Sequence, residues 1–254
     1  MRSEQVPAQS ESVAASRDTG RNSQDIEDFI YLISHDVRSS VRALLELPNW
    51  ISEDLEEAGF PVQGQVAASI DLMNRHTSRL DRMLVDLLTF SRIGRMQRVE
   101  TLSLDGVLDQ VLEELDIPGA FVVTRDLKGL EITIGNRDIL TLLSALISNA
   151  VRHHDKASGK IHVAALMDGT EVVLSVSDDG PGIAEEFRER IFGAMITLHP
   201  RDEVEGSGMG LTNVRKIANF YGGTASVVPT VFGKGCCIEV RTTGRCQPDN
   251  PNKL

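Results

Sequence analysis

A histidine beside a carboxylate is the first feature of the sequence that could do chemistry. His35 and Asp36 lie in residues 34–40, Ser-His-Asp-Val-Arg-Ser-Ser. If Ile30 and Ile33 occupy the core positions of a heptad, His35 falls at an exposed position and its ring nitrogens are accessible. Asp36 can then orient the imidazole and accept its proton while the ring attacks a phosphoryl group. A solvent-facing histidine beside an aspartate is also common, so the pair alone does not decide the chemistry.

An amide, a guanidinium and an imidazole share one face of a second predicted helix. Asn149, Arg152 and His153 lie at helical spacing from one another, and Ala145 lies one turn before them. An amide oxygen there can bind Mg²⁺, arginine can meet phosphates, and imidazole can stack on a base. Asn149 can equally be a surface amide, so this group is also weak evidence by itself.

A third group of residues directly follows a predicted strand. Asp178 begins the run Asp-Asp-Gly-Pro-Gly-Ile, in which Gly180 and Gly182 permit close approach of the backbone to a ligand. A buried aspartate accepts a hydrogen bond from an exocyclic amine such as that of adenine. An acidic β-turn with proline and glycine has the same composition, so both interpretations stay open.

Three alternate glycines lead into another predicted helix. Gly206, Gly208 and Gly210 belong to the run Gly-Ser-Gly-Met-Gly-Leu, which ends at Leu211. Glycines before a helix N-terminus expose amide donors and the positive end of the helix dipole to phosphate. The run lacks the Gly-Lys-Ser/Thr ending of a phosphate-binding loop and the preceding strand of a dinucleotide fingerprint.

Two long amphipathic helices must carry His35. Apolar residues recur at steps of three and four over residues 26–51 and again over 66–87, and residues 59–64 form a turn between them. This pattern predicts a helical hairpin. A single hairpin buries its apolar faces poorly, so we expect two copies to pair into a four-helix bundle, as a homodimer. Pro48 is expected to kink the first helix.

The chain after residue 98 alternates between helical and strand patterns. Ser103 is a plausible N-cap of one helix and Asn136 of another. The mixture predicts an α/β sandwich with one face of its sheet covered by helices. The expected helices are 103–115, 136–153 and 209–220, and the expected strands are 121–124, 131–134, 161–166, 171–177, 224–228 and 236–241.

The composition bounds the partners and the compartment. The formal net charge of −11 argues against nucleic acid or an anionic membrane as the main partner. No apolar run approaches the ~20 residues of a membrane span, and the N-terminus lacks a signal-peptide core, so we expect a cytoplasmic protein. Cys236, Cys237 and Cys246 are expected to be reduced thiols.

Taken together, the four motifs resemble those of the sensor histidine kinases of two-component signalling, over about residues 25–241. The segment around His35 resembles the phosphoacceptor box, and Asn149-Ala150-Val151-Arg152 resembles the asparagine box of the Bergerat-type ATPase fold. The runs that start at Asp178 and Gly206 resemble its two glycine boxes. Arg190-Ile191-Phe192, between them, resembles the phenylalanine box.

The resemblance implies a role for each residue of the motifs. His35 is the nucleophile that attacks the γ-phosphate of ATP, with Asp36 as its base, and the phosphate then passes to an aspartate of a separate response regulator. Asn149 coordinates Mg²⁺. The other implied ATP-binding residues are Arg152 near the phosphates, His153 in place of the family's usual aromatic ring, Asp178 at the adenine amine, Gly180 and Gly182 shaping that pocket, Ile183 packed near the base, and Gly206, Gly208, Gly210 and Leu211 bordering the triphosphate.

The resemblance also implies a domain organisation. It implies a dimerisation and histidine phosphoacceptor domain at 24–97 and a catalytic ATP-binding domain at 98–244. The polar residues 1–23, which show almost no apolar periodicity, are predicted to form a disordered tail, and residues 245–254 a loose tail. Residues 193–205 become a mobile lid over ATP. The implied partners are a second copy of the chain, a receiver domain and a separate sensor protein.

Three positions depart from the family pattern. Ala145 replaces an Asn or Glu that supports the metal and its water, which puts the catalytic rate in doubt. Ser40 replaces a proline. Ser39 stands where a Thr or Asn often positions water for dephosphorylating the partner, so Ser39 is a candidate for phosphatase activity.

Two rival interpretations remain open at this point. One is a dimeric histidine phosphotransfer protein whose ATP site has degenerated, which Ala145 favours slightly and the intact glycine boxes oppose. The other is a serine kinase or binding module of the anti-sigma type on the same ATPase fold, which the hairpin at residues 26–92 disfavours.

Overall fold

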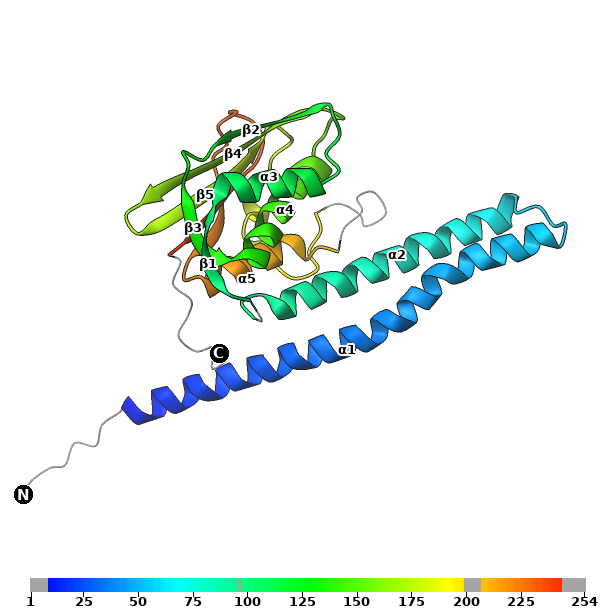
Figure 1. Cartoon of the computed structure of the whole chain (residues 1–254), viewed down its shortest axis with the longest axis horizontal. Helices are drawn as coiled ribbons and strands as arrows, with labels where there is room; N and C mark the ends of the chain where they lie inside the picture. Colours follow the sequence, from blue (N-terminus) through cyan, green and yellow to red (C-terminus); the bar gives the residue numbers. More distant parts are fainter. Residues whose placement is uncertain (1–8, 96, 199–206, 244–254) are drawn as a thin grey trace, which may run out of the picture.

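In the described part of the chain, a helical hairpin is followed by an α/β domain, as the sequence predicts (Figure 1). The computed structural model describes residues 9–95, 97–198 and 207–243, and the side chains of residues 9–29 and 35 lie outside this description. No helix in the described part combines the length and apolarity that crossing a lipid bilayer requires. The residues predicted to form a loose tail at 245–254 lie outside the described ranges.

The hairpin consists of α1, Gln9–Glu57, and α2, Gly64–Arg92. Its tip uses Gly59 and Gly64, with φ of 81° and 58°, a left-handed conformation that glycine adopts without steric cost. The first helix starts earlier than expected, because α1 includes residues 9–23 of the predicted disordered tail. A helix that is already nucleated by its packed part extends at little cost per residue, which composition alone does not reveal.

Pro48 lies inside α1, where it has no backbone N–H to donate to the preceding turn. Figure 1 shows α1 changing direction in its C-terminal half, the part that contains Pro48. The hydroxyl of Ser52 donates to the carbonyl of Pro48 at 2.9 Å. The bend therefore lies in the region of the helix where the sequence predicts a kink.

Two contacts set the register between the helices of the hairpin. Arg38 Nε lies 3.6 Å from an Asp81 carboxylate oxygen, and Arg92 donates to the Tyr31 hydroxyl at 3.5 Å. His35 lies between Arg38 and Tyr31 on α1, and Asp86 lies between Asp81 and Arg92 on α2. Because the helices run antiparallel, His35 and Asp86 occupy the same level of the hairpin.

The hairpin leaves much of its apolar surface uncovered within one chain. Among the hairpin side chains that the structure describes, only a few apolar ones, such as Val41, Ile70, Leu84 and Leu88, are buried. The predicted homodimer stays a prediction, and an uncovered apolar face of this extent is what pairing would bury. The exposed large apolar side chains of the two helices include Leu32, Ile33, Val37, Leu44, Leu47, Trp50, Ile51, Val66, Leu72, Met73 and Leu80.

The α/β domain is built on a five-stranded sheet with the order β2-β4-β5-β7-β6. The β2–β4 pair is parallel and the other pairs are antiparallel. Helices cover one face of the sheet (Figure 1), onto which β4 directs its buried Ile161, Val163 and Ala165. The strands are β2 Phe121–Asp126, β4 Gly159–Asp168, β5 Glu171–Asp178, β6 Thr224–Val228 and β7 Cys237–Thr242, and the helices are α3 Leu104–Glu114, α4 Asn136–Arg152 and α5 Gly210–Phe220, with single 3₁₀ turns η1 Glu185–Phe187 and η2 Arg190–Phe192.

A second, two-stranded sheet joins the hairpin to the domain. The sequence predicts β3, Glu131–Gly135, but misses its antiparallel partner β1, Val99–Ser103. Most residues of β1 are exposed and need not be apolar. Its sequence therefore lacks the alternation of apolar and polar residues by which a half-buried strand is recognised. The predicted N-cap Ser103 is confirmed, since its hydroxyl accepts from the Gly106 amide at 3.5 Å.

The predicted N-cap of α4 is wrong. The helix is capped at Gly135, without a side-chain hydrogen bond, and Asn136 is its first helical residue. Gln97, from the segment between hairpin and domain, instead accepts the Arg137 amide at 3.1 Å. A distant side chain thus satisfies a donor of the first turn, which local capping rules cannot anticipate.

The end of α2 and the residues that directly follow it are held against the α/β domain by hydrogen bonds. The Gly94 amide and the Tyr221 hydroxyl both donate to the Asp138 carboxylate, at 3.0 and 2.8 Å. Lys216 of α5 donates to the Phe90 carbonyl at 2.7 Å, and its ammonium lies 4.0 Å from the centre of the Phe90 ring. The C-terminal end of α2 therefore docks against α5.

Candidate functional site

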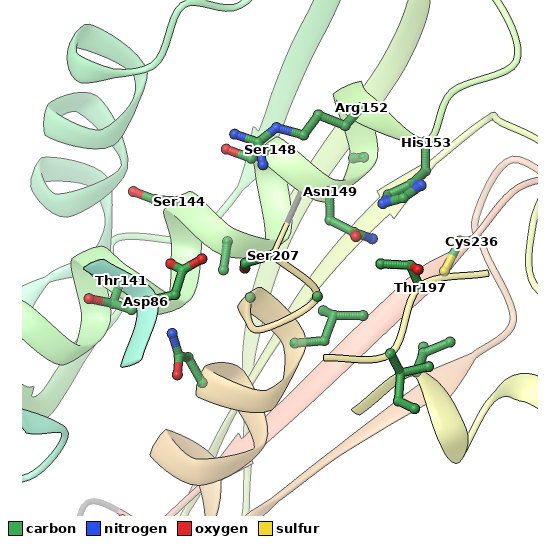
Figure 2. A pocket seen from close by; sticks show the side chains of 18 of the residues that line it. Asp86, Thr141, Ser144, Ser148, Asn149, Arg152, His153, Thr197, Ser207 and Cys236 are labelled. Carbon is green, nitrogen blue, oxygen red and sulfur yellow. The ribbon is translucent and has the colours of Figure 1, made fainter. Parts of the chain in front are cut away.

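A pocket of about 500 Å³ lies between α4, the start of α5 and the C-terminal part of α2. Figure 2 shows the labelled side chains from these elements converging on it. The predicted site residues that line it are Asn149, Arg152, His153, Asp178, Gly182, Ile183, Gly208, Gly210 and Leu211. Their convergence depends on the fold, because they come from three separate segments of the chain.

One face of α4 forms a wall of the pocket. Asn149 and Arg152 lie one turn apart on this face, and Ala145 lies one turn before Asn149. His153, the first residue after the helix, also points toward the pocket (Figure 2). The wall places an amide, a cation and an imidazole side by side.

Asp178 ends β5 and is almost fully buried, with 7% of its surface exposed. Its Oδ1 accepts the Gly180 amide at 2.9 Å and the Cys236 amide at 3.1 Å. Burial raises the pKa of the Asp178 carboxyl, and these two hydrogen bonds oppose that rise. The aspartate is therefore held in one orientation by its own turn and by the residue before β7.

The glycines of this turn have different roles. Gly180 does not line the pocket, and its amide holds Asp178 from behind. Gly182 has φ of 81°, and a Cβ there would lie 2.7 Å from the Gly235 carbonyl oxygen. Glycine at 182 thus permits a left-handed bend and a close backbone contact that a larger residue would disrupt.

The second glycine run brings backbone donors to the pocket. Gly208 has φ of 73°, and a Cβ there would lie within 2.8 Å of the backbone of Met195. The Ser207 hydroxyl accepts the Met209 amide at 3.1 Å, and α5 starts at Gly210. The free amides of the first turn of α5 and its dipole make this end suited to an anion. Gly206 lies outside the described residues.

Asp86 of α2 also lines the pocket, although it belongs to the hairpin. The Ser207 hydroxyl is hydrogen-bonded to its carboxylate, and Figure 2 shows the two side chains next to each other. Burial raises the pKa of the Asp86 carboxyl, while the Ser207 bond and the positive charges of Arg152 and Arg82 oppose the rise. The hairpin thus contributes a carboxyl group to the end of the pocket that is suited to an anion.

The predicted phosphoacceptor segment lies on the hairpin, outside the α/β domain. His35 lies on α1, and the exposed Asp36 and Ser39 follow it on the same helix. Neither Asp36 nor Ser39 lines the pocket, and the side chain of His35 lies outside the described residues. The backbone of His35 is nevertheless level with Asp86, so the pocket faces the part of the hairpin that carries the histidine.

Sequence reasoning missed several lining residues. Thr141, Ser144 and Ser148 extend the polar face of α4, and the helical spacing from Asn149 and Arg152 was the signal that could have found them. Asn213, one turn into α5, is 2% exposed and its side-chain oxygen has no hydrogen-bond partner among the described residues. Thr197 and Leu198, from the predicted lid at 193–205, also line the pocket, while residues 199–205 lie outside the described ranges.

Comparisons with known proteins agree with this arrangement. Residues 135–244 match the family described as histidine kinase-, DNA gyrase B- and HSP90-like ATPase. Cyanobacterial phytochrome B from a Nostoc species is 30% identical over 222 residues, which are 85% of this chain and 29% of that protein. The sensor protein RstB from Escherichia coli is 33% identical over 175 residues, which are 66% of this chain and 40% of that protein.

Solved structures share the fold. Full-length ShkA in complex with AMPPNP aligns with a TM-score of 0.62 at 22% identity, covering 85% of this chain and 45% of that one. The Acinetobacter baumannii histidine kinase AdeS aligns with a TM-score of 0.55 at 22% identity, covering 80% of this chain and 96% of that one. At such identities the likeness concerns the fold alone.

The hairpin, the ATPase-type domain and the pocket together define a class of protein, the histidine kinases of signal transduction. The chain belongs to the sensor histidine kinases, and it spans less than half the length of the two curated relatives named above.

Proposed function

We propose that the chain binds ATP and Mg²⁺ in this pocket and phosphorylates His35. The observation that carries the proposal is the convergence of Asn149, Arg152, Asp178 and the Gly208–Gly210 turn on one cavity that faces the hairpin at the level of the histidine. Phosphoryl transfer depends mainly on positioning and charge neutralisation, and these residues provide both.

The two ends of the pocket suit the two ends of ATP. Asp178 accepts a hydrogen bond from the adenine amine, with Gly182 and Ile183 beside the base. At the other end, Arg152 and the amides around Gly210 receive the phosphates, which explains why cationic and backbone donors gather there.

The pocket also fits a magnesium ion. Asn149 offers an amide oxygen on the wall between the two ends, and Mg²⁺ prefers oxygen ligands together with substrate phosphates. Mg²⁺ supplies charge neutralisation for the triphosphate when it is bound. Ala145 offers no oxygen one turn before Asn149, so fewer protein ligands surround the metal than the family pattern provides.

In the proposed reaction, a ring nitrogen of His35 attacks the γ-phosphorus of ATP. The new N–P bond forms as the bond between that phosphorus and the β,γ-bridging oxygen breaks, and ADP leaves. Asp36 accepts the proton from the other ring nitrogen and orients the imidazole. The α/β domain carries ATP, so it moves relative to α1 to bring the γ-phosphate to the histidine.

The proposal extends to the partners. The uncovered apolar face of the hairpin supports a homodimer, and the phosphoryl group passes from His35 to an aspartate of a response regulator receiver domain. A separate sensor protein, or segments beyond this chain, supply the signal, and we propose a cytoplasmic location for the kinase core. The degenerate phosphotransfer protein is not favoured, because the pocket holds its nucleotide-type residues.

A labelling experiment tests this function. The purified chain, His35→Gln and His76→Gln are incubated with Mg²⁺ and ATP labelled in the γ-phosphate, and the label is then exposed to acid and to base. His76 is a matched control, since it is exposed on α2 of the same hairpin. We expect acid-labile, base-stable label in the wild type and His76→Gln and none in His35→Gln.

Three outcomes would contradict the proposal. Label that survives acid would indicate a serine kinase, and label that persists in His35→Gln would place the phosphoryl group elsewhere. An absence of both label and ATP binding would leave the phosphotransfer protein as the remaining interpretation.

A further inference from the structure

His154 is a buried imidazole to which the proposed reaction gives no role. It follows His153 just beyond α4, and its side chain is only 1% exposed. Its ring meets the edge of the Phe121 ring of β2, with the centroids 5.3 Å apart and the planes at 90°. A polar ring this deeply buried needs hydrogen-bond partners to offset the loss of water.

The neighbours of His154 determine the position of its ring hydrogen. The Lys156 amide lies 3.1 Å from Nδ1 and can only donate, so Nδ1 accepts. The hydrogen of the neutral ring is then on Nε2, which donates to Asp179 Oδ1 at 3.1 Å. A second carboxylate, that of Asp155, approaches Nδ1 only to 3.5 Å, too far for a strong hydrogen bond.

Asp179 is itself tied to the sheet. Its Oδ1 also accepts the Lys160 amide of β4 at 2.6 Å. This hydrogen bond is the largest cause of the lowered pKa of the Asp179 carboxyl, and the bond from His154 adds to it. His154 therefore links the end of α4 to the residue that directly follows Asp178.

Two glycines leave the space that the imidazole fills. A Cβ at Gly159 would lie 2.5 Å from Nε2 of His154, and a Cβ at Gly180 would lie 3.2 Å from Cδ2. Gly180 is the residue whose amide donates to Asp178 Oδ1. The ring thus packs directly behind the turn that holds Asp178.

Asp178 is also held by contacts from another segment. The Cys236 amide donates to its Oδ1 at 3.1 Å, and the Thr230 hydroxyl donates to its backbone carbonyl at 3.1 Å. Both contacts come from the segment between β6 and β7. His154 adds a contact from the segment just after α4, so two separate segments support the turn.

We propose that His154 is a positioning residue for adenine recognition. By holding Asp179 and packing against Gly180, it keeps the Asp178 carboxylate directed at the base. The inference rests on the proposed function, because it takes Asp178 to be the group that reads adenine. The ring does not line the pocket, so its loss should weaken binding of the base and leave transfer of the phosphoryl group unchanged.

The test compares nucleotide binding and turnover in full-length variants. In His154→Ala we expect the Kd for ATP to rise about ten-fold, the preference for ATP over GTP to shrink by a similar factor, and kcat at saturating ATP to stay within about two-fold. In His154→Gln the amide can still donate to Asp179, so most of the affinity should return. His162→Ala is the control, since this histidine lies on β4 and bonds Thr124 instead.

A second variant covers the case in which His154→Ala does not fold. Gly159→Ala keeps the imidazole but crowds it, and we expect it to weaken ATP binding in the same direction. An unchanged Kd and an unchanged preference for ATP in a folded His154→Ala would overturn the inference. Affinity in His154→Gln as low as in His154→Ala would also overturn it, since the hydrogen bond would then not be the cause.

Failure of the underlying function gives a different result. If the wild-type chain does not bind ATP, or if Asp178→Asn binds it as tightly as the wild type, the nucleotide assignment itself is wrong. If Asp178→Asn loses affinity while His154→Ala does not, the proposed function stands and only the role of His154 is refuted.

Discussion

Asp138 shows how a single buried carboxyl joins distant parts of this chain. It is 1% exposed, and it accepts hydrogen bonds from the Tyr221 hydroxyl and the Gly94 amide. The same Tyr221 oxygen accepts the Gly135 amide at 2.9 Å, ahead of α4. Burial raises the pKa of the Asp138 carboxyl above its usual 3.8, and the bond from Tyr221 limits the rise by stabilising the ionised form.

These contacts predict a pH-dependent loss in Tyr221→Phe. Because the pKa of the Asp138 carboxyl is raised in the folded state, the free energy of unfolding decreases as pH rises from 3.8 through the folded pKa. The hydrogen bond from Tyr221 makes this decrease smaller, because it stabilises the ionised carboxylate. We therefore expect the free energy of unfolding to fall by about 1–3 kcal/mol at pH 7 and by less near pH 4. Urea unfolding at both pH values measures this, with Tyr31→Phe as the control. An equal loss at the two pH values would contradict the role of the ionised carboxyl.

At the scale of elements, the segment after α2 fits closely against α5. Gly94 has φ of 76°, and a Cβ there would lie 2.3 Å from the ring of Phe220. Lys216 of the same helix holds the Phe90 carbonyl. The end of the hairpin therefore packs on α5 through backbone contacts that leave no room for a side chain.

Gly94→Ala separates this packing from backbone strain. Alanine at a left-handed φ costs about 1–2 kcal/mol anywhere, and the clash with Phe220 adds about 1–3 kcal/mol. Gly129→Ala is the matched control, because Gly129 has φ of 63° but nothing within 4 Å of a built Cβ. We expect a clearly larger loss of unfolding free energy in Gly94→Ala, measured by chemical denaturation. Equal losses in the two variants would show that the contact with Phe220 contributes little.

At the scale of the whole molecule, the hairpin forms part of the proposed nucleotide site. The carboxylate of Asp86 on α2 lines the pocket at the proposed phosphate end. There it is hydrogen-bonded to Ser207 and interacts with the positive charge of Arg152. The Asp86 carboxylate thus interacts with groups, Ser207 and Arg152, that a phosphate of the nucleotide would otherwise bind. Nucleotide binding and docking of the domain on α2 are thus expected to oppose each other in this arrangement.

Asp86→Asn tests that opposition. Removing the negative charge should lower the Kd of metal-free ATP roughly five-fold, which corresponds to about 1 kcal/mol. Titration calorimetry in the presence of a chelator measures it, and Asp71→Asn, on the exposed surface of α2, controls for net charge. An unchanged or weaker affinity in Asp86→Asn would show that the carboxylate does not compete with the phosphates.

Much of the architecture could be predicted from local patterns. The periodic apolar residues specified the hairpin, and the order of the four motifs pointed to an ATPase-type domain before any contact was known. Residues such as Asn149 and Arg152 were found because their helical spacing puts them on one face of α4. Period and residue type are properties of neighbouring positions, so a single sequence is enough to reveal them.

The rest depended on contacts between distant positions. Asp86 reaches Ser207, Asp138 meets Tyr221, and His154 meets Asp179 only because the fold brings separate segments together. No local rule marks these residues, since each is an ordinary polar side chain in its own segment. The sequence by itself therefore determined most of the elements and many of the chemical groups that line the pocket. The tertiary structure decided which groups share that pocket, which residues support them from outside it, and how the hairpin contacts it.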